Sequence, residues 1–446
     1  MDYTPHTEED VATILDALGL DCVSDLYKPI PESLRLKDLD LPTGMTEIEA
    51  TRLVDSIAAD TAKTAPDLSF LGAGAYDHFS PSVVDAMISR GEFFTAYTPY
   101  QPEVSQGTLR VIFEFQTMMC ELTGMEVANA SMYDGSSALA EAVMMAVRIR
   151  SGDRVILPRS LHPFYRQVVK TYTTGIGLEI VTAPWTSDGT IDLDWLETEA
   201  DDRTTAVVVQ NPNFLGVLEP IDRIGTILAD RAPSFVAAVN PHTLGLIEPP
   251  GSYGADIVVG EGQSLGLPLS FGGPYVGFFT TRQEHVRKMP GRIVGQTTDV
   301  NGKRAYVLTL KTREQDIRRE KATSNICTNQ TLCGTAVTIY LSALGPNGLA
   351  EVGKVNWTRS HAAMEGLLAL DGVTRFFSGP FFNEFVWKTS RPAADVLRDV
   401  AASGVSAGVD LGMLDPSLSD CILTCVTEKR SADDVDRLVG AVREVI

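Results

Sequence analysis

The chain has 446 residues, of which 44% are hydrophobic and 21% charged, with 37 glycines and 24 prolines. This length allows two or three domains, and the composition is that of a folded globular protein. The 37 lysines and arginines against 58 aspartates and glutamates give a net charge of −21, which argues against nucleic acid or an anionic membrane as a partner. No apolar run approaches the roughly 20 residues that cross a bilayer. The acidic N-terminus lacks the order of a signal peptide, so we expect a soluble cytoplasmic protein.

Two further features of the composition bear on the setting of the protein. Only 11 of its basic residues are lysines and 26 are arginines, and an acidic surface poor in lysine is typical of adaptation to high salt, where self-repulsion is screened. The alternative is an ordinary acidic enzyme. The six cysteines match neither zinc nor redox spacings, so we expect free thiols and no metal site.

Residues 1–60 are predicted to form an N-terminal arm of helices broken by a proline-rich connector. Apolar residues recur at helical spacing over Asp10–Leu18, and Gly19 ends the pattern. Prolines between residues 29 and 42 exclude a continuous helix there. Such a segment is expected to wrap over a neighbouring molecule rather than to form a core of its own.

Residues 61–325 are predicted to form a large α/β domain. Six short runs in it are apolar throughout rather than alternating, which is typical of strands buried on both faces of a mainly parallel sheet covered by helices. These runs are Arg154–Leu157, Leu178–Val181, Ala206–Val209, Phe235–Val239, Asp256–Val259 and Tyr275–Phe279. Ligands bind at the carboxyl ends of such strands.

Residues 326–446 are predicted to form a smaller C-terminal α+β domain. We expect helices over Thr335–Leu344 and Asn356–Leu370, and strands near Glu384–Lys388 and Ile422–Val426.

A turn before an alanine-rich helix, with Gly135, Ser136 and Ser137 in sequence, could bind a phosphate at the helix N-terminus. The alternative is a plain serine N-cap, with Glu141 near the positive end of the helix. A helix of this kind before an α/β sheet and a small C-terminal domain matches the layout of fold-type I pyridoxal phosphate (PLP) enzymes.

Two more residues fit that layout, and one essential residue is missing. His162 follows the first strand of the sheet, where an aromatic ring would stack on the cofactor, and Asn240 stands where an acid would pair with the pyridinium nitrogen. The chemistry needs a lysine amine for the Schiff base, expected near residues 260–266. No lysine occurs between Lys170 and Lys288. The cofactor nucleophile is therefore absent, and an amide at position 240 cannot supply a charge.

Several segments closely resemble hallmark segments of the glycine cleavage system P-protein family, and the resemblance covers essentially the whole chain. These segments are Phe70–Gly74, Tyr97–Gly107, Gly254–Ser264, Phe271–Pro274 and Lys321–Gln330. A chain of this length without the lysine is similar to the alpha subunit of the family's two-chain form. The family often has aspartate at the position of Asn240.

The resemblance implies a division of labour between two chains. The beta subunit would carry PLP on its lysine, decarboxylate glycine and pass the aminomethyl group to the lipoyl arm of the H-protein. This chain would bind no cofactor covalently but would complete the partner's site across the interface. A self-sufficient PLP enzyme, such as an aminotransferase or desulfurase, and a purely structural scaffold for the beta subunit are the alternatives.

The candidates for the interface contribution offer hydroxyls, amides and positive charge suited to anions. They are Thr98, Tyr100, Gln101, Arg318, Arg319, Lys321, Thr323, Ser324 and Asn325. Their alternatives are a structural turn at Pro99 and, for the two arginines, solvated surface or ion pairs with Asp316 and Glu320. The residues Ser136, Ser137, His162 and Asn240 are interpreted as remnants of an ancestral cofactor site.

Overall fold

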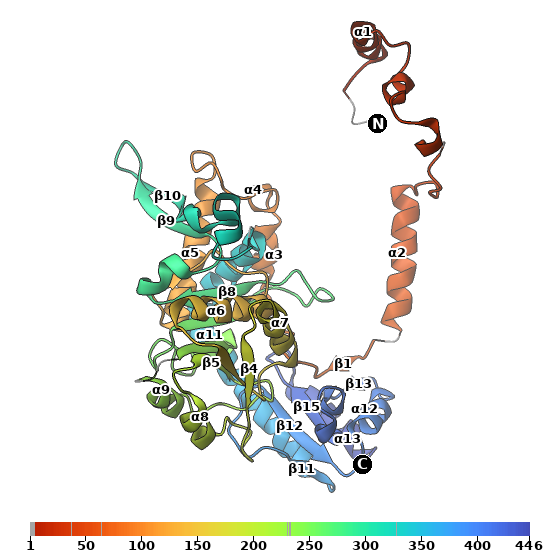
Figure 1. Cartoon of the computed structure of the whole chain (residues 1–446). Helices are drawn as coiled ribbons and strands as arrows, with labels where there is room; N and C mark the ends of the chain where they lie inside the picture. The colour runs from red at the N-terminus through yellow and green to blue at the C-terminus, as the bar shows by residue number, and fades with distance from the viewer. Residues whose placement is uncertain (1–4, 37, 64, 230, 232, 327) are drawn as a thin grey trace. The chain divides into compact units, whose positions relative to one another are not determined.

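The computed structural model describes residues 5–36, 38–63, 65–229, 231, 233–326 and 328–446 (Figure 1). The chain divides into two compact units, the first ending at Ala65 and the second spanning Pro66–Ile446. The predicted domain boundaries at residues 60 and 325 remain predictions.

The first unit consists of short helices without a core. Helix α1 (Glu8–Leu18) begins at a capping box formed by Thr7 and ends at Gly19, which confirms the predicted helix. The 3-10 turn η1 (Val23–Tyr27) precedes the proline-rich connector, and a second one, η2 (Glu32–Leu34), lies within it. Helix α2 (Glu47–Ala62) follows a second capping box at Thr46. No described residue of this unit is buried.

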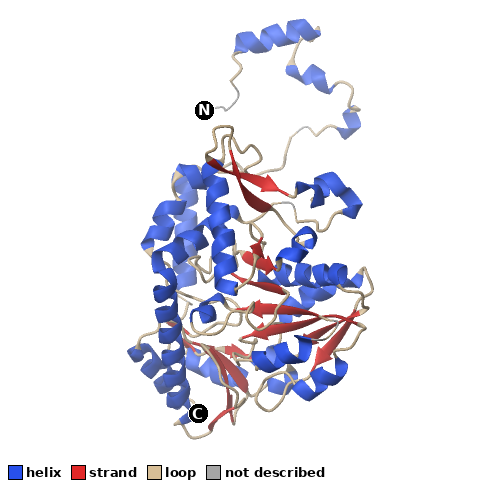
Figure 2. Ribbon diagram, turned by 90° about the vertical axis from the view of Figure 1, so that its left-hand side faces the viewer, coloured by secondary structure: helices blue, strands red, loops and turns tan. Residues whose placement is uncertain are grey.

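A seven-stranded sheet forms the centre of the second unit, and its strands are drawn in red in Figure 2. The strands from edge to edge are β2 (Val127–Ala128), β8 (Gly277–Thr281), β7 (Ile257–Glu261), β6 (Ser234–Val239), β5 (Thr204–Asn211), β3 (Arg154–Pro158) and β4 (Glu179–Ala183). Strands β3 to β7 are parallel, whereas β8 is antiparallel to both of its neighbours. All six predicted strands exist, and the mainly parallel sheet is confirmed.

Apolar residues alternate between the two faces of this sheet because successive side chains of a strand point to opposite sides. On one face, Val155 and Val236 pack with α6 (Gly135–Ile149) and α7 (Pro163–Thr174). On the other face, Ile156 and Phe235 pack with α5 (Gln106–Thr123), α8 (Leu193–Glu199), α9 (Ile221–Ala229) and α11 (Thr331–Leu368). The sheet is thus the middle of three layers.

The C-terminal part pairs helices with a four-stranded antiparallel sheet, β11 (Val373–Arg375), β12 (Glu384–Thr389), β15 (Cys421–Cys425) and β14 (Val409–Asp410). Helices α12 (Ala393–Ala401) and α13 (Ala432–Arg443) and the fully buried Trp387 complete its core. Both predicted helices correspond to parts of α11 and the first ends at Leu344 as predicted, but the second begins next to Gly345 and not at Asn356. The break is confined to Gly345, where φ is 63°, because Pro346 can occupy the first turn of a new helix.

Shorter elements connect these layers. They are β1 (Leu68–Ser69), which pairs with β13 (Val405–Ser406), α3 (Ser82–Ile88), α4 (Gly91–Phe94), η3 (Pro241–Gly245), η4 (Gln283–Lys288), the hairpin of β9 (Ile293–Thr298) and β10 (Arg304–Thr309), η5 (Lys311–Arg313), α10 (Gln315–Arg318), η6 (Arg319–Lys321), η7 (Leu411–Met413) and η8 (Pro416–Leu418).

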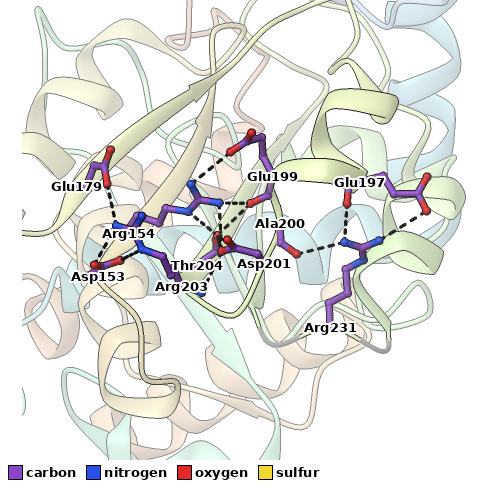
Figure 3. Close-up of polar contacts among 10 residues, drawn as sticks. All are labelled: Asp153, Arg154, Glu179, Glu197, Glu199, Ala200, Asp201, Arg203, Thr204 and Arg231. Atoms are coloured by element: carbon purple, nitrogen blue, oxygen red, sulfur yellow. Dashed lines mark hydrogen bonds and ion pairs between the residues drawn. The ribbon is translucent and has the colours of Figure 1, made fainter.

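Arginines and acids form a network at the amino ends of the parallel strands (Figure 3). The side chain of Arg154, 10% exposed, pairs with Glu199 at 3.3 Å and with Asp201 at 3.1 Å. The more exposed Arg203 pairs with Asp153 at 3.0 Å and with Glu179 at 3.5 Å. The network therefore lies at the sheet edge opposite to the one where ligands bind in such folds.

The described residues lack three features that would point to a membrane, a metal or a disulfide. No described helix is long and apolar enough to cross a membrane. Within the same residues, no group of three His, Cys, Asp or Glu side chains could hold a metal ion. The five described cysteines are free, and Cys327 lies outside the described residues.

Candidate functional site

The carboxyl ends of the parallel strands surround a small pocket in the second unit. His162 follows β3, Asn240 follows β6 and Glu261 ends β7, and all three line this pocket. Its volume is about 40 Å³, whereas small-molecule sites occupy roughly 300–1,000 Å³. No lysine is found among the described lining residues.

A carboxylate of the chain itself occupies the N-terminus of α6. Oε2 of Glu261 accepts a hydrogen bond from the backbone N–H of Gly135 at 2.9 Å. Its Oε1 accepts from the backbone N–H groups of Gln263 at 2.9 Å and of Val276 at 3.3 Å. Burial raises the pKa of Glu261 to about 7. The Gly135 N–H, one of the groups at the helix N-terminus that could hold a phosphate, is thus bound to an internal acid.

The two serines of the predicted phosphate site are engaged by a second carboxylate. Asp134 is the N-cap of α6, and its Oδ1 accepts from the backbone N–H of Ser137 at 2.8 Å and from the hydroxyl of Ser136 at 2.5 Å. The alternative of a serine N-cap is therefore wrong. An aspartate performs that role because its carboxylate reaches both donors at once.

The ring of His162 is enclosed by the chain. It stacks on Tyr165 with 4.7 Å between ring centroids, and Phe214 lies 4.8 Å away. Its Nδ1 accepts from the backbone N–H of Phe164, so Nε2 carries the proton and donates to the Ala73 carbonyl at 3.0 Å. Burial lowers the pKa of His162 to about 4, which keeps the ring neutral near pH 7.

The remaining pocket groups also bind to one another. The amide oxygen of Asn240 accepts from the backbone N–H of His242 at 3.0 Å. Glu384 accepts from the Ala73 N–H and from the Tyr76 hydroxyl, both at 2.6 Å, and burial raises its pKa to about 7. The pocket therefore does not fit PLP: its volume is too small, its anion position is filled and no amine is present.

A second group of predicted residues gathers around a buried arginine. Arg292, just before β9, is 3% exposed. It donates to the hydroxyl oxygens of Thr98 at 3.3 Å and of Tyr100 at 3.0 Å, and it pairs with Glu314 at 3.5 Å. The side chain of Gln101, next in the sequence, makes no hydrogen bond to a described residue.

Four residues of the third group, Arg319, Thr323, Ser324 and Asn325, line a cleft of about 360 Å³, whereas Arg318 and Lys321 are not among its lining residues. There the hydroxyl of Ser324 donates to the buried Glu141 at 2.7 Å, and Arg148 also lines the cleft. Burial raises the pKa of Glu141.

The exposed cations Arg318, Arg319 and Lys321 form no ion pair with any described residue, so the alternative of ion pairs with Asp316 and Glu320 is wrong. The guanidinium of Arg318 instead donates to the Thr312 carbonyl at 3.0 Å.

One segment connects the second and third groups. Arg313 donates to the carbonyls of Met289 and Gly291, directly before Arg292, and its own carbonyl accepts from the Thr323 N–H at 3.3 Å. Arg313 thus links the Thr323 backbone to the segment just before Arg292, and Arg292 in turn binds Thr98 and Tyr100. Sequence reasoning missed Arg292 and Glu261. Arg292 belongs to no recognised motif. Glu261, in contrast, lies within residues 260–266, where the Schiff-base lysine was expected.

The parallel sheet between helices, with the small C-terminal sheet, defines a fold-type I PLP-transferase-like protein. Sphingosine-1-phosphate lyase of Burkholderia pseudomallei K96243 shares this fold, with a TM-score of 0.66 over 93% of this chain and 94% of that chain at 15% identity. A crystal structure of glycine decarboxylase (P-protein) of the glycine cleavage system, in inhibitor-bound form, is much more similar. Its TM-score is 0.92 at 42% identity, over the full length of both chains.

Sequence comparison gives the family. The family model described as "Glycine cleavage system P-protein" matches residues 1–442 of this chain. The chain is 50% identical over its full length, and that of the relative, to "Probable glycine dehydrogenase (decarboxylating) subunit 1" of Moorella thermoacetica. It is 47% identical, again over both full lengths, to the protein of the same name from Desulfitobacterium hafniense. The chain belongs to the glycine cleavage system P-protein family.

Proposed function

We propose that this chain is the alpha subunit of a two-chain glycine decarboxylase. The beta subunit carries PLP on a lysine, binds glycine and releases CO2, and the aminomethyl group passes to the lipoyl arm of the H-protein. The observation that carries the proposal is the pairing of a full-length match to relatives named subunit 1 with a closed, lysine-free pocket. The same pocket argues against a self-sufficient PLP enzyme.

The contribution of this chain to the reaction is to complete the partner's site. Thr98, Tyr100 and Gln101 and the segment 318–325 supply it. Three exposed cations without described acidic partners, in a chain of net charge −21, support a role in binding an anion or an acidic surface. None of these residues is among those that line the closed pocket.

The N-terminal unit serves the assembly as an arm that holds the partner. Its apolar side chains lack a core, and Leu18, Leu36, Leu41 and Ile57 are all more than half exposed. Interfaces of obligate complexes bury more than about 2,000 Å² and are rich in such side chains. The acidic, lysine-poor composition supports a cytoplasm of high salt as the setting.

The test is the absorbance of this chain with added PLP, alone and with the beta subunit, followed by borohydride reduction and peptide mapping. The expected result is no cofactor band and no reduced lysyl adduct on this chain, with both on the partner. A reducible adduct on this chain, at Lys288 or Lys321, would overturn the proposal.

Glycine decarboxylation by the mixture separates participation from scaffolding. Tyr100→Phe and Lys321→Ala are expected to lower turnover while the complex stays intact. Unchanged kinetics for both variants would leave this chain a scaffold for its partner.

A further inference from the structure

The guanidinium of Arg292 fixes which way two hydroxyl groups can form hydrogen bonds. A guanidinium has five donors and no acceptor. Its bonds to Thr98 at 3.3 Å and to Tyr100 at 3.0 Å therefore use the oxygen of each hydroxyl as the acceptor. The proton of each hydroxyl remains free to be donated elsewhere.

Neither proton has a hydrogen-bond acceptor within the described part of the chain. The hydroxyls of Thr98 and Tyr100 donate to no described residue. Thr98 is half-buried and Tyr100 is 47% exposed, so both groups can reach a ligand that approaches from outside. Two free O–H donors two residues apart in one loop suit the two oxygens of an oxyanion.

The charges behind the pair favour the same kind of ligand. The guanidinium carbon of Arg292 lies 5.1 Å from the centroid of the Tyr100 ring, and Nζ of Lys311 lies 5.3 Å from it. Glu314, 3.5 Å from Arg292, balances one of these two positive charges. One net positive charge remains beside the two donors, which attracts an anion and disfavours a cation.

We propose that Thr98 and Tyr100 form a donor pair for an oxyanion held by the partner subunit, and that Arg292 is the positioning residue that sets both hydroxyls as donors. The inference rests on the proposed function and extends it by naming the ligand class. The oxyanion is a carboxylate or a phosphate ester, and these two sources are the substrate glycine and the cofactor.

The experiment uses the full chain assembled with its beta subunit and measures three quantities: kcat and KM for glycine, and the apparent Kd for PLP. Tyr100→Phe and Thr98→Val remove one donor each and keep the shape of the side chain. Tyr97→Phe is the matched control, because Tyr97 lies in the same loop, is 78% exposed and makes no hydrogen bond through its hydroxyl to a described residue.

The expected result is a loss of about ten- to hundred-fold for each donor variant, the usual cost of a hydrogen bond to a charged group. A rise in the KM for glycine identifies the carboxylate as the ligand, and a rise in the Kd for PLP identifies the phosphate. Tyr97→Phe should leave all three quantities at the wild-type value.

Arg292 is tested through its effect on the pair. Arg292→Gln should raise the same constant, KM or Kd, as Tyr100→Phe. The double variant Arg292→Gln/Tyr100→Phe should raise it no further than Arg292→Gln alone, because both substitutions remove the same interaction. Arg292→Lys should restore part of the loss, since an ammonium can hold one hydroxyl but not both.

The proposal is overturned if Tyr100→Phe and Thr98→Val match Tyr97→Phe in all three quantities within an active complex. That outcome differs from failure of the proposed function, in which the wild-type mixture itself does not decarboxylate glycine. Because Tyr100 is exposed, its substitution tests the proposal even if the Arg292 variants do not fold.

Discussion

At the scale of single residues, the side chain of Glu261 acts as an internal anion at the positive end of α6. It accepts from three backbone N–H groups, those of Gly135, Gln263 and Val276. Removing it leaves these donors buried without a partner, which is costly. An external anion of similar size could then take its place.

Glu261→Ser is therefore expected to create a weak phosphate site. Phosphate should raise the thermal unfolding midpoint of this variant relative to chloride at equal ionic strength, because a ligand that binds only the folded state stabilises it. Glu219→Ser is the matched control: Glu219 is also a buried carboxyl group whose pKa is raised to about 7, but its carboxylate accepts from Ile191 instead of α6. Equal phosphate effects in the two variants would contradict this role of Glu261.

Glu384 makes the stability of the chain depend on pH. Burial raises its pKa to about 7, against an ordinary value of 4.5, so the folded state binds this proton more tightly than the unfolded state does. The contribution of Glu384 to the free energy of unfolding is fully present below about pH 4.5 and is lost as the pH rises to about 7. Glu384→Gln mimics the protonated form. It should reduce the change in unfolding free energy between about pH 4.5 and pH 7 by about 1–3 kcal/mol. Urea unfolding at several pH values measures it, and identical slopes for variant and wild type would refute the assignment.

The absent lysine could be predicted from the sequence, but the closed pocket could not. An amine is either present in the stretch 260–266 or not, which a sequence shows directly. The bond from Glu261 to Gly135 joins residues 126 positions apart and depends on how β7 is placed against α6. The same holds for Arg292, whose two hydroxyl partners lie almost 200 positions earlier.

At the scale of elements, strands with a central apolar run were predictable and mainly polar strands were not. Strands β3, β5, β6 and β7 are almost entirely buried, and the predicted ranges agree with them and with the partly exposed β4 to within a few residues. The hairpin of β9 and β10 was missed because it contains polar stretches such as Gln296–Thr298. The reversal of β8 was also missed, since apolar composition does not give strand direction.

The buried arginine at the start of β3 is expected to stabilise the sheet. Arg154 holds the end of α8 and the start of β5 through Glu199, Asp201 and Thr204 (Figure 3). Arg154→Met should cost about 1–3 kcal/mol of unfolding free energy, because the Thr204 hydroxyl and the Glu199 carbonyl lose their hydrogen bonds to a buried cation. Arg203→Met, at an exposed site of the same network, should change the urea midpoint little. Equal losses in both variants would show that burial is not the cause.

At the scale of the whole molecule, the N-terminal unit is expected to contribute to assembly and not to the stability of the isolated chain. Leu53 and Ile57 lie on one face of α2 at helical spacing and are exposed. Ile57→Glu should leave the unfolding midpoint of the chain unchanged and weaken binding of the beta subunit at least about tenfold. Ala59→Glu, on the opposite side of the helix and also exposed, is the control. Binding measured by calorimetry that is equal for both variants would exclude this face from the interface.

The excess of acidic residues sets the response of the whole chain to salt. With a net charge of −21, repulsion between acids outweighs the attraction in its surface ion pairs, and salt screens both. The unfolding midpoint should therefore rise between about 0.1 M and 1 M potassium chloride, over which the Debye length falls from about 10 Å to 3 Å. A midpoint that falls with salt would mean that the ion pairs dominate.

If the proposed function holds, the carboxylate of Glu261 also decides how many changes this chain would need to bind a cofactor of its own. A chain that lacked only its lysine could regain the amine by one substitution. Here a new lysine would face a pocket of about 40 Å³ whose anion position is filled, and removal of Glu261 alone would leave buried donors and no amine. Neither change alone would supply both an amine and an open anion position, so at least two substitutions would be needed together.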